Sequence, residues 1–410
     1  MRRYAIAVLP GDGIGAEVVE QALFALRTAG PFLRAAQLDL QEIPCGGRYY
    51  AEHGCEWAEG SFARCQAADA ILLGAVGHVG ADGKTVTRAD GELAGYDVVI
   101  GTRMKLDLYA NVRPVRLYPG VRHRIVNELK QVWRPEHVDF VVVRENTEDA
   151  YVHGSHTLER GGVVELVASP TIITRKGADR VLRFAFELAR ERAAERDRGG
   201  VHGSEAGTRR RSKVTCTDKA NVIQAHRFFR ARCAEIAREF PDVQVDYAYT
   251  DALTQWMIRD PNWFDVIVAP NFAGDVISDL GSALQGGMGL AAGANIGDRH
   301  AMFEPIHGSA PPLAGKNEAN PLACLLATAM MLVWLGRRHT DGELLAAGAA
   351  LESAVAETLA TGTVMTPDIG GTATTSEVGA AVVAAFRDRL ATASRAGGVD
   401  AGAGGTTHRS

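Results

Sequence analysis

The sequence has no excess of positive charge, no cysteine motif and no long uninterrupted apolar run, and each absence disfavours a class of protein. The 44 Lys and Arg residues are outnumbered by 49 Asp and Glu, which disfavours nucleic acid as a partner because no strong positive field attracts phosphates. The six cysteines form neither a C-x-x-C pair nor a zinc spacing, so we expect reduced, structural thiols. The longest apolar runs, such as residues 322–335, are too short or too interrupted to span a bilayer.

The composition that remains is typical of a soluble protein with one large or two ordinary α/β domains. The 410 residues are 46% hydrophobic and 23% charged, with a formal net charge of −5. The amino-terminal residues pass from Met-Arg-Arg-Tyr directly into an apolar segment, without the pattern of a signal peptide. We therefore expect a cytoplasmic protein.

Short apolar segments alternate with longer amphipathic ones, and this alternation predicts an α/β protein. We expect strands at residues 4–9, 70–73, 140–143, 213–216, 243–249 and 266–269. We expect helices at residues 15–29, 177–196, 221–239 and 319–336. Three segments have the composition of peripheral chain: a mobile loop at 78–95, an exposed insertion at 196–212 and a disordered tail at 396–410.

A glycine-rich turn, Pro-Gly-Asp-Gly-Ile-Gly, occupies residues 10–15 after the first expected strand. Its spacing is G-x-G-x-G, whereas the dinucleotide-binding fingerprint is G-x-G-x-x-G, and Asp12 stands where a phosphate would approach. A tight strand-to-helix turn and a weak nucleotide signal therefore remain as alternative interpretations.

Two aspartates four residues apart, Asp275 and Asp279, follow the expected strand at 266–269. On a helix they share one face, where like charges repel unless a cation lies between them. Asp251, after the expected strand at 243–249, offers a third oxygen ligand, and three carboxylates without Cys or His favour Mg²⁺ or Mn²⁺. A solvated acidic face is the alternative.

Basic residues also follow the expected strands. Arg144 comes directly after one strand, where α/β sheets place ligand contacts, and arginine pairs well with carboxylates. A surface salt bridge is the alternative for each arginine taken alone. Lys219 lies at an expected helix start, where the helix dipole disfavours a positive charge. A lysine at such a position hints at a functional role. The loop at 303–311, which contains His307, is by itself a structural turn.

These segments, taken in order, resemble the β-decarboxylating hydroxyacid dehydrogenases of the isocitrate/isopropylmalate dehydrogenase family. The resemblance spans residues 4–386 and rests on LPGDGIG, LLGAVG, an arginine pair ending in NVRP, VVVRENTE, TDKANV, NFAGDVISDL and FEPIHGSAP. It implies a two-domain α/β fold, not a Rossmann fold, with a mixed sheet, flanking helices and a cleft between the domains. The domains would be 1–108 with 286–395, and 109–285. An arm at about 151–174 would clasp a second copy in a homodimer with shared active sites.

The resemblance also implies the site residues. Tyr151 and Lys219 would be the catalytic acid and base. The substrate would be held by Arg103, Arg113, Arg144 and Asp251, with Val99 and Ile100 against its variable group. Mg²⁺ or Mn²⁺ would be bound by Asp251, Asp275 and Asp279, and Lys219 and Asp251 would come from the partner subunit. NAD, with NADP as the alternative, would be bound by Gly74, Ala75, Val76, Gly77, Glu304, His307, Gly308, Ser309, Ala310, Pro312 and Asn320.

The implied reaction is oxidative decarboxylation of a malate-type 2-hydroxy acid. Val99 and Ile100 favour 3-isopropylmalate or a close 3-substituted malate, and no Ser-x-Asn pair is present to bind the third carboxylate of isocitrate. Asn146 resembles the isocitrate and tartrate branches instead. Tartrate, D-malate, homoisocitrate, isocitrate or a specialised malate analogue therefore remain as alternative substrates. A non-catalytic regulatory subunit is an alternative of another class.

Two further residues depart from the family pattern. Asp149 stands where the segment R-E-x-T-E-G has its glycine, and aspartate tolerates a left-handed backbone better than most residues. Pro312 replaces the aspartate that binds the adenosine ribose in NAD-using relatives. The choice between NAD and NADP consequently stays open at this point.

Overall fold

The computed structural model describes residues 1–152, 154–197 and 212–399, which divide into two compact units. Unit 1 is Met1–Val98 with Phe303–Ser410, and unit 2 is Val99–Met302. The sequence predicts domains in the same discontinuous order, but it predicts the boundaries at residues 108 and 286, whereas the two units meet after Val98 and after Met302. Strand β13 (Ala292–Ile296) explains one difference, because it pairs with β4 (Ala110–Arg116) of unit 2.

Unit 1 has strands in the order β14–β3–β1–β2. Their bounds are β1 (Arg2–Leu9), β2 (Ala36–Glu42), β3 (Ala70–Leu73) and β14 (Ala301–Pro305), which begins two residues before the unit does. β1 runs parallel to both β2 and β3, and its residues from Ile6 to Leu9 are fully buried apolar side chains. The continuous apolar run of β1 is what a strand covered on both faces requires.

The helices of unit 1 are α1 (Gly15–Ala29), α2 (Gly47–His53), α3 (Ser61–Ala67), α9 (Leu322–His339), α10 (Gly342–Thr361) and α11 (Thr375–Val399). Of these, α1, α9, α10 and α11 pack on one another. By length and composition alone, α10 is apolar enough to cross a membrane, but it is covered here by α9 and α11. It is therefore a core helix of unit 1.

Unit 2 has strands in the order β11–β10–β12–β7–β4–β13. Their bounds, besides β4 and β13, are β7 (Asp139–Glu145), β10 (Lys213–Asp218), β11 (Gln244–Tyr249) and β12 (Val266–Ala269). β11, β10, β12 and β7 are parallel, whereas β4 is antiparallel to both β7 and β13. This mixed sheet confirms the predicted fold class.

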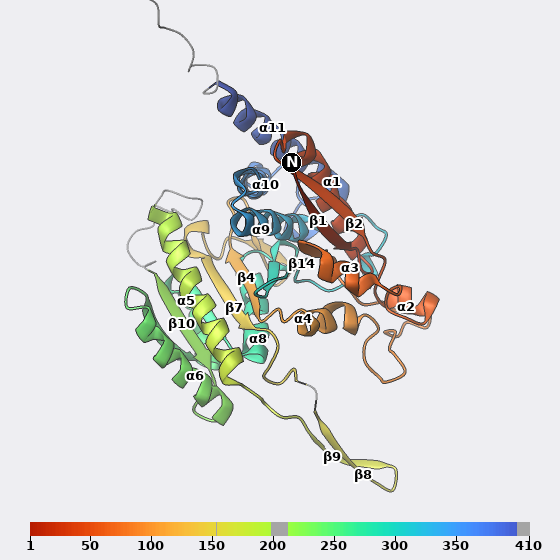
Figure 1. Ribbon diagram of the computed structural model, residues 1–410, viewed down its shortest axis with the longest axis vertical. Helices are drawn as coiled ribbons and strands as arrows, with labels where there is room; N and C mark the ends of the chain where they lie inside the picture. Colours follow the sequence, from red (N-terminus) through yellow and green to blue (C-terminus); the bar gives the residue numbers. More distant parts are fainter. Residues whose placement is uncertain (153, 198–211, 400–410) are drawn as a thin grey trace, which may run out of the picture. The chain divides into compact units, whose positions relative to one another are not determined.

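Helices cover both faces of the unit 2 sheet. The helices that pack on the sheet are α5 (Arg175–Asp197), α6 (Gln224–Ile236), α7 (Thr250–Arg259) and α8 (Asn271–Leu284), while the short helix α4 (Thr102–Lys105) precedes β4 in the chain. Arg144 of β7 faces α8, while Asp139, of opposite parity on the same strand, contacts Arg192 of α5. Because alternate residues of a strand point to opposite faces, α8 and α5 lie on opposite sides of the sheet. Figure 1 shows α5 and α6 side by side along β10.

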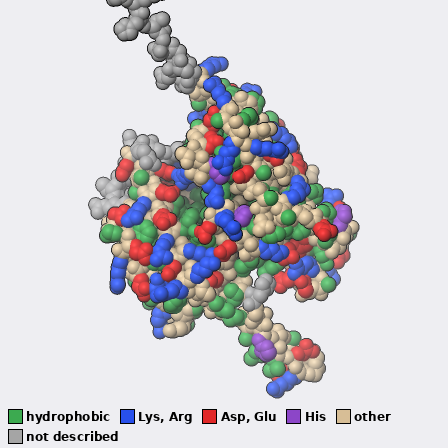
Figure 2. All heavy atoms as spheres, in the orientation of Figure 1, with side chains coloured by type: hydrophobic (Ala, Val, Ile, Leu, Met, Phe, Trp, Pro, Cys, Tyr) green, Lys and Arg blue, Asp and Glu red, His purple; other side chains and the backbone are tan. Residues whose placement is uncertain are grey.

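A two-stranded arm extends from unit 2 (Figure 1). It is formed by β8 (His156–Arg160) and β9 (Val163–Ala168), all of whose residues are exposed. Hydrophobic side chains are part of its surface, with Val163 63% and Val167 61% exposed (Figure 2). A second, shorter hairpin is formed by β5 (His123–Ile125) and β6 (Glu128–Lys130).

The predicted elements differ from the observed ones mainly at their ends. The strands at 70–73 and 266–269 and the helix at 15–29 have the predicted bounds. α6 begins only at Gln224, so Lys219 lies in the turn before the helix, and the expectation of a lysine at a helix start is wrong. α11 continues to Val399, so the prediction that a disordered tail starts at residue 396 is wrong by about four residues. Most of the predicted insertion (198–211) and of the tail (400–410) lies outside the described residues.

The expected loop at 78–95 contains neither a helix nor a strand, but two isolated bridges organise it. Its Arg88 donates to Glu56, which is 6% exposed, and also pairs with Asp90 and Asp97. The Glu56 carboxylate in turn accepts from the backbone N–H groups of Asp97 and Val98. The loop is thus fastened to the segment that precedes Val99.

Candidate active site

Three elements of unit 2 bring the predicted substrate and metal residues together. Asn111 of β4 stands directly opposite Arg144 of β7, and α8 crosses the same face. A Cβ on Gly274 of α8 would lie 2.7 Å from the Cβ of Arg144, so only glycine lets the helix approach this closely. The close approach places Asp275, the next residue, over the two strands.

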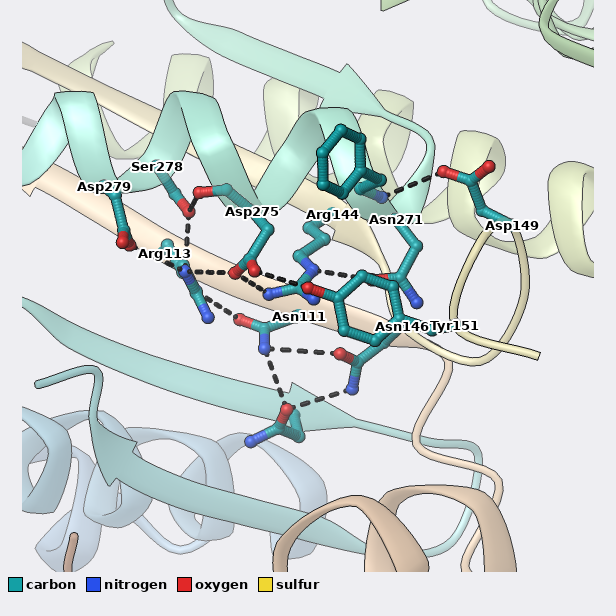
Figure 3. Close-up of polar contacts among 12 residues, drawn as sticks. Asn111, Arg113, Arg144, Asn146, Asp149, Tyr151, Asn271, Asp275, Ser278 and Asp279 are labelled. Carbon is teal, nitrogen blue, oxygen red and sulfur yellow. Dashed lines mark hydrogen bonds and ion pairs between the residues drawn. The ribbon is translucent and has the colours of Figure 1, made fainter. Parts of the chain in front are cut away.

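Asp275 is the centre of the cluster (Figure 3). One oxygen, Oδ1, accepts from Arg144 Nη1 and lies 3.3 Å from Arg113 Nη1. The other, Oδ2, accepts from the Tyr151 hydroxyl at 2.6 Å. Arg144 also donates from Nε to Asn271 Oδ1 at 2.8 Å, and its guanidinium lies 5.0 Å from the centre of the Tyr151 ring.

The cation between the two aspartates of α8 is a guanidinium in this structure. Arg113 Nη1 lies 3.3 Å from Asp275 Oδ1 and 3.5 Å from Asp279 Oδ1, and it donates to Ser278 Oγ at 2.6 Å. The like charges that the sequence places one helical turn apart are therefore bridged, as the repulsion argument requires. A metal ion bound by both carboxylates would compete with Arg113 for them.

The electrostatics of the two aspartates differ. Burial disfavours the charged form of Asp275, but Arg144 and Arg113 outweigh burial and lower its pKa below the ordinary value. Asp279 has a raised pKa, because burial and the charge of Asp275 outweigh Arg113. Burial, with the neighbouring charge of Arg113, lowers the pKa of Arg144 to about 10. Burial and the hydrogen bond to Asp275 raise the pKa of Tyr151, which keeps its proton on the phenol at neutral pH.

A buried network of asparagine amides lies beside the cluster and is bonded to Arg113. Asn111 Oδ1 accepts from Arg113 Nε at 3.1 Å, and Asn111 Nδ2 donates to Asn295 Oδ1 at 2.9 Å. Asn146 Nδ2 donates to the same oxygen and to the carbonyl of Leu108, both at 2.9 Å. All three amides are at most 3% exposed, so they orient the site from within the protein.

Lys219 and Asp251 form a separate pair, with Lys219 Nζ 2.9 Å from Asp251 Oδ2. Lys219 lies between β10 and α6, and Asp251 is in the first turn of α7. The ammonium of Lys219 lowers the pKa of Asp251 through their hydrogen bond. Across the described ranges, no group of three or more His, Cys, Asp or Glu side chains is placed to hold a metal ion. The structure therefore does not bring Asp251 together with Asp275 and Asp279 within one chain.

The other predicted substrate residues precede or form α4. Arg103 is buried in this helix, and its charge also contributes to lowering the pKa of Asp275. Val99 and Ile100 belong to a short π-helix, Asp97–Gly101, and are partly exposed.

The predicted cofactor residues belong to loops of unit 1 that are fastened by the 10–15 turn. Asp12 is 2% exposed and accepts from the backbone N–H groups of Gly47, Arg48 and Gly77, each at 2.8 Å. The N–H of Ile14 donates to the carbonyl of Ser309 at 2.9 Å. The turn thus joins the 74–77 loop, which includes Gly74, Ala75 and Val76, to the 307–310 loop.

The remaining predicted cofactor residues lie along one segment. Glu304 is buried in β14, and Pro312 lies in a short 3₁₀ helix, Pro311–Leu313, after the positive-φ residue Ala310. Asn320 donates to Asp368 at 3.0 Å and accepts from Leu322 N–H at 3.0 Å at the start of α9. His307 Nδ1 lies 3.0 Å from the carbonyl of Gly308, and burial lowers the pKa of its imidazole.

A comparison with known proteins agrees with this arrangement. A family model described as isocitrate/isopropylmalate dehydrogenase matches residues 5–382. The chain belongs to this family. It is 37% identical over 389 residues to a 3-isopropylmalate dehydrogenase of Clavibacter michiganensis subsp. michiganensis, covering 94% of this chain and 98% of the relative. A 3-isopropylmalate/3-methylmalate dehydrogenase of Methanocaldococcus jannaschii is 36% identical over 387 residues, covering 94% and 99%.

The likeness extends to solved structures. The isocitrate dehydrogenase of Methylococcus capsulatus has a TM-score of 0.76 and 32% identity over 94% of this chain and 99% of that chain. The resemblance inferred from the motifs is thereby confirmed, and this chain is a dehydrogenase. In this chain the 10–15 turn has a structural role, because the backbone amides of Asp12, Ile14 and Gly15 are already bonded to backbone carbonyls.

Several residues of the candidate site were not predicted from the sequence. Ser278 and Asn271 lie three and four residues from Asp275 on α8, and Asn111 lies two residues before Arg113 on β4. Helical and strand periodicity would have placed each of them on the same face as its functional neighbour. No such local signal pointed to Asn295 or to the contact of His226 with Asp149, because both depend on residues far apart in the sequence.

Proposed function

We propose that this chain catalyses the NAD- and Mg²⁺- or Mn²⁺-dependent oxidative decarboxylation of 3-isopropylmalate or a close 3-substituted malate. The observation that carries this proposal is the convergence of Arg113, Arg144 and the Tyr151 hydroxyl on Asp275 (Figure 3). Two guanidinium groups supply the fork geometry that binds a carboxylate, and a protonated phenol beside them can deliver a proton.

We assign substrate binding and the two proton transfers to different residues of the chain. Arg103, Arg113 and Arg144 would bind the carboxylate that is lost, and Lys219 would take the proton of the substrate 2-hydroxyl. Tyr151 would return a proton to C3 after CO₂ departs, for which its raised pKa is suited. NAD, held by the unit 1 loops, would supply the hydride acceptor, and a divalent ion held by Asp275 and Asp279 would supply the positive charge that lowers the pKa of the 2-hydroxyl.

The donor set fits a hard divalent cation. Asp275 and Asp279 present oxygen ligands from successive turns of α8, and the raised pKa of Asp279 indicates a carboxylate that a further cation would stabilise. Within the described residues, the side chains bonded to these carboxylates are Arg113, Arg144 and Tyr151, with neither Cys nor His among them, which disfavours zinc. The third carboxylate, Asp251, is absent from this cluster within one chain, so we propose that the partner subunit supplies it together with Lys219.

Two exposed apolar surfaces support a homodimer. The β8–β9 arm exposes a run of valines, and α7 and α8 expose Trp256 (53%), Phe272 (57%) and Val276 (49%). Large exposed apolar side chains gathered on packed helices are typical of a surface that another chain covers. A second copy that covers these helices and the arm is the partner we propose, because it would also complete the metal site.

The unit 1 loops fit an adenosine-containing cofactor. The buried Nε2 atom of His307 has no hydrogen-bond partner within the described part of the chain, and Pro312 is an exposed residue without charge. NAD is the proposed cofactor because no lysine or arginine follows Pro312 before Lys316 to attract the 2′-phosphate of NADP. We propose a cytoplasmic location, in keeping with reduced cysteines, none of which is paired in the structure.

The position of Asn146 bears on the choice of substrate. Its amide is 3% exposed and is bonded to Asn295 and to the carbonyl of Leu108, so it serves the buried network. We therefore assign Asn146 to the support of the site, although its resemblance to the tartrate and isocitrate branches keeps those substrates as alternatives. Val99 and Ile100 remain as the apolar pair that favours an isopropyl group, since each buried methylene contributes about 0.8 kcal/mol.

A panel of malate-type 2-hydroxy acids, assayed by nicotinamide absorbance with Mg²⁺, tests the proposal. We expect kcat/KM for 3-isopropylmalate to exceed that for D-malate, tartrate and isocitrate. Replacing Val99 and Ile100 together by alanine should narrow this preference, while exposed Val126→Ala on the β5–β6 hairpin serves as the control. A clear preference for tartrate or D-malate would contradict the substrate assignment, and full activity in EDTA would contradict the metal.

A further inference from the structure

Asp149, the residue that departs from the family's glycine, has φ of 68°, in the left-handed region that the sequence predicted it would have to adopt. Its backbone is held by hydrogen bonds in both directions with Ile172. The side chain is 2% exposed, so its carboxylate is buried. The backbone conformation alone could be adopted by glycine, so the carboxylate is not needed for it. Because a buried charge is costly, this carboxylate requires partners that stabilise it.

The first partner is the amino-terminal end of α8. Asp149 Oδ2 accepts from the backbone N–H of Phe272, the second residue of that helix, at 2.9 Å (Figure 3). The residue at the N-cap position of α8 is Pro270, whose side chain makes no cap hydrogen bond. Asp149 therefore accepts from an N–H group of α8 that has no acceptor within the helix itself. This is the helix that carries Asp275 and Asp279.

The second partner is His226, which is 4% exposed in the first turn of α6. Its Nε2 lies 3.5 Å from Asp149 Oδ1, and its Nδ1 accepts from the backbone N–H of Lys219 at 3.0 Å. Because Nδ1 accepts an amide proton, the neutral ring carries its own proton on Nε2, the nitrogen that faces the carboxylate. The imidazole therefore connects the Asp149 carboxylate to the backbone of Lys219.

We propose that Asp149 and His226 form a positioning pair that holds the Lys219 turn and the amino-terminal end of α8 in register. Neither residue touches the reacting atoms. In the proposed dimer they act through Lys219, which serves the partner's active site, and through Asp275, which belongs to the chain's own site. The inference rests on the proposed function for its catalytic readout, because Lys219 is there the base. Misplacement of a reacting group by about 1 Å can cost about 100-fold in rate, which is the scale of effect available to such a pair.

Two pairs of variants separate the hydrogen bonds from the fold. Asp149→Gly keeps the backbone, since glycine adopts this φ without strain, and removes only the carboxylate. Its control is Asn127→Gly, at another positive φ, on the exposed β5–β6 hairpin. His226→Leu removes both contacts of the ring, whereas His226→Asn keeps an oxygen in reach of the Lys219 N–H.

We expect Asp149→Gly and His226→Leu to lower kcat about 10- to 100-fold with little change in substrate KM. His226→Asn should recover most of this loss, and Asn127→Gly should behave as wild type. Because Lys219 takes a proton as hydride leaves, deuterium at C2 should slow the two impaired variants more than it slows wild type. A merely structural loss would reduce the amount of active enzyme without changing this isotope effect.

Hydrogen exchange decides the structural part independently of activity. The peptide that contains Lys219 and the peptide at the start of α8 should both lose protection in Asp149→Gly, and the Lys219 peptide alone should respond strongly to His226→Leu. Unchanged protection in both variants overturns the positioning pair whatever the enzyme's substrate. Wild-type inactivity toward all malates, with protection lost as expected, overturns the proposed function and leaves the pair supported.

Discussion

In unit 2 the predicted substrate and metal residues meet through charged side chains, whereas in unit 1 the predicted cofactor loops meet through backbone groups. Asp275 draws together Arg113, Arg144 and Tyr151 across two strands and a helix. Asp12 instead accepts three backbone N–H groups and so fixes the path of neighbouring loops. The same residue type therefore pairs with functional side chains in one unit and fixes the geometry of loops in the other.

The difference has a physical reason. A carboxylate whose partners are guanidinium groups can exchange them for a metal, because those guanidinium charges can pair with the carboxylate of a substrate instead. A carboxylate bonded to backbone amides has no such freedom, and losing it leaves several buried donors unsatisfied. Substitutions in unit 2 should accordingly affect turnover, and those at Asp12 should affect stability and cofactor binding.

The largest effect should come from the two proton-transfer residues. Tyr151→Phe should impair protonation of C3 and Lys219→Met should impair hydride transfer, each lowering kcat about 10²- to 10⁴-fold. Deuterium at C2 should slow Lys219→Met more visibly than wild type. Stopped-flow measurement of nicotinamide reduction separates the two steps, and wild-type rates in both variants would show that the roles are wrongly assigned.

Removing the carboxylate at the centre of the unit 2 cluster should come next. Asp275→Asn and Asp279→Asn should each lower turnover by at least about 100-fold, because each removes a charged oxygen ligand. Binding of Mn²⁺, followed by its paramagnetic signal, should weaken in both. Asp242→Asn, an exposed aspartate paired with Arg190, is the matched control and should bind the ion as wild type does.

The lowered pKa of Asp275 predicts that the free energy of unfolding depends on pH. Its pKa lies below the ordinary value of 3.8 in the folded protein, so its ionisation stabilises the fold above that pH. The contribution is lost as the pH falls through the lowered pKa. Denaturant unfolding of wild type and Asp275→Asn between pH 2 and about pH 5 should therefore show a smaller loss of stability on acidification in the variant. Parallel curves would mean that the ion pairs with Arg113 and Arg144 contribute nothing.

A smaller effect is expected at the cofactor loop. Pro312→Asp introduces a carboxylate that can accept from ribose hydroxyls and repel a 2′-phosphate. Because such a charge-assisted hydrogen bond contributes roughly 1.5–3 kcal/mol, kcat/KM for NAD should rise about 10- to 150-fold and that for NADP should fall. Initial rates with both cofactors on both proteins test this. A strong preference of the wild type for NADP would reveal a phosphate-binding group elsewhere in unit 1.

The smallest change in activity is expected at Asp12. Asp12→Asn places an amide group among three backbone donors, so it should destabilise the fold by about 1–3 kcal/mol and raise KM for NAD about fivefold. kcat should stay near wild type, since Asp12 lies outside the unit 2 cluster. Asp82→Asn is the control, because that exposed carboxylate accepts from a single backbone N–H. A fall in kcat without a fall in thermal stability would contradict the comparison between the units.

Local sequence determined much of this protein. Runs of apolar residues defined β3 and β12, and helical spacing placed Asp275 and Asp279 on one face of α8. The ordered motifs together identified the family, its fold and the chemistry class. These features depend on residues within a few positions of one another, where periodicity and turn chemistry are decisive.

Only the tertiary structure showed which groups occupy those carboxylates. Arg113 and Tyr151 reach Asp275 across more than 100 residues of sequence, and Asn295 reaches Asn111 across a greater distance still. The structural role of Asp12 and the link from Asp149 to His226 likewise depend on segments that are far apart in the sequence and that the fold brings together. Pairings of this kind follow from strand order and helix packing, which no local pattern in the sequence encodes.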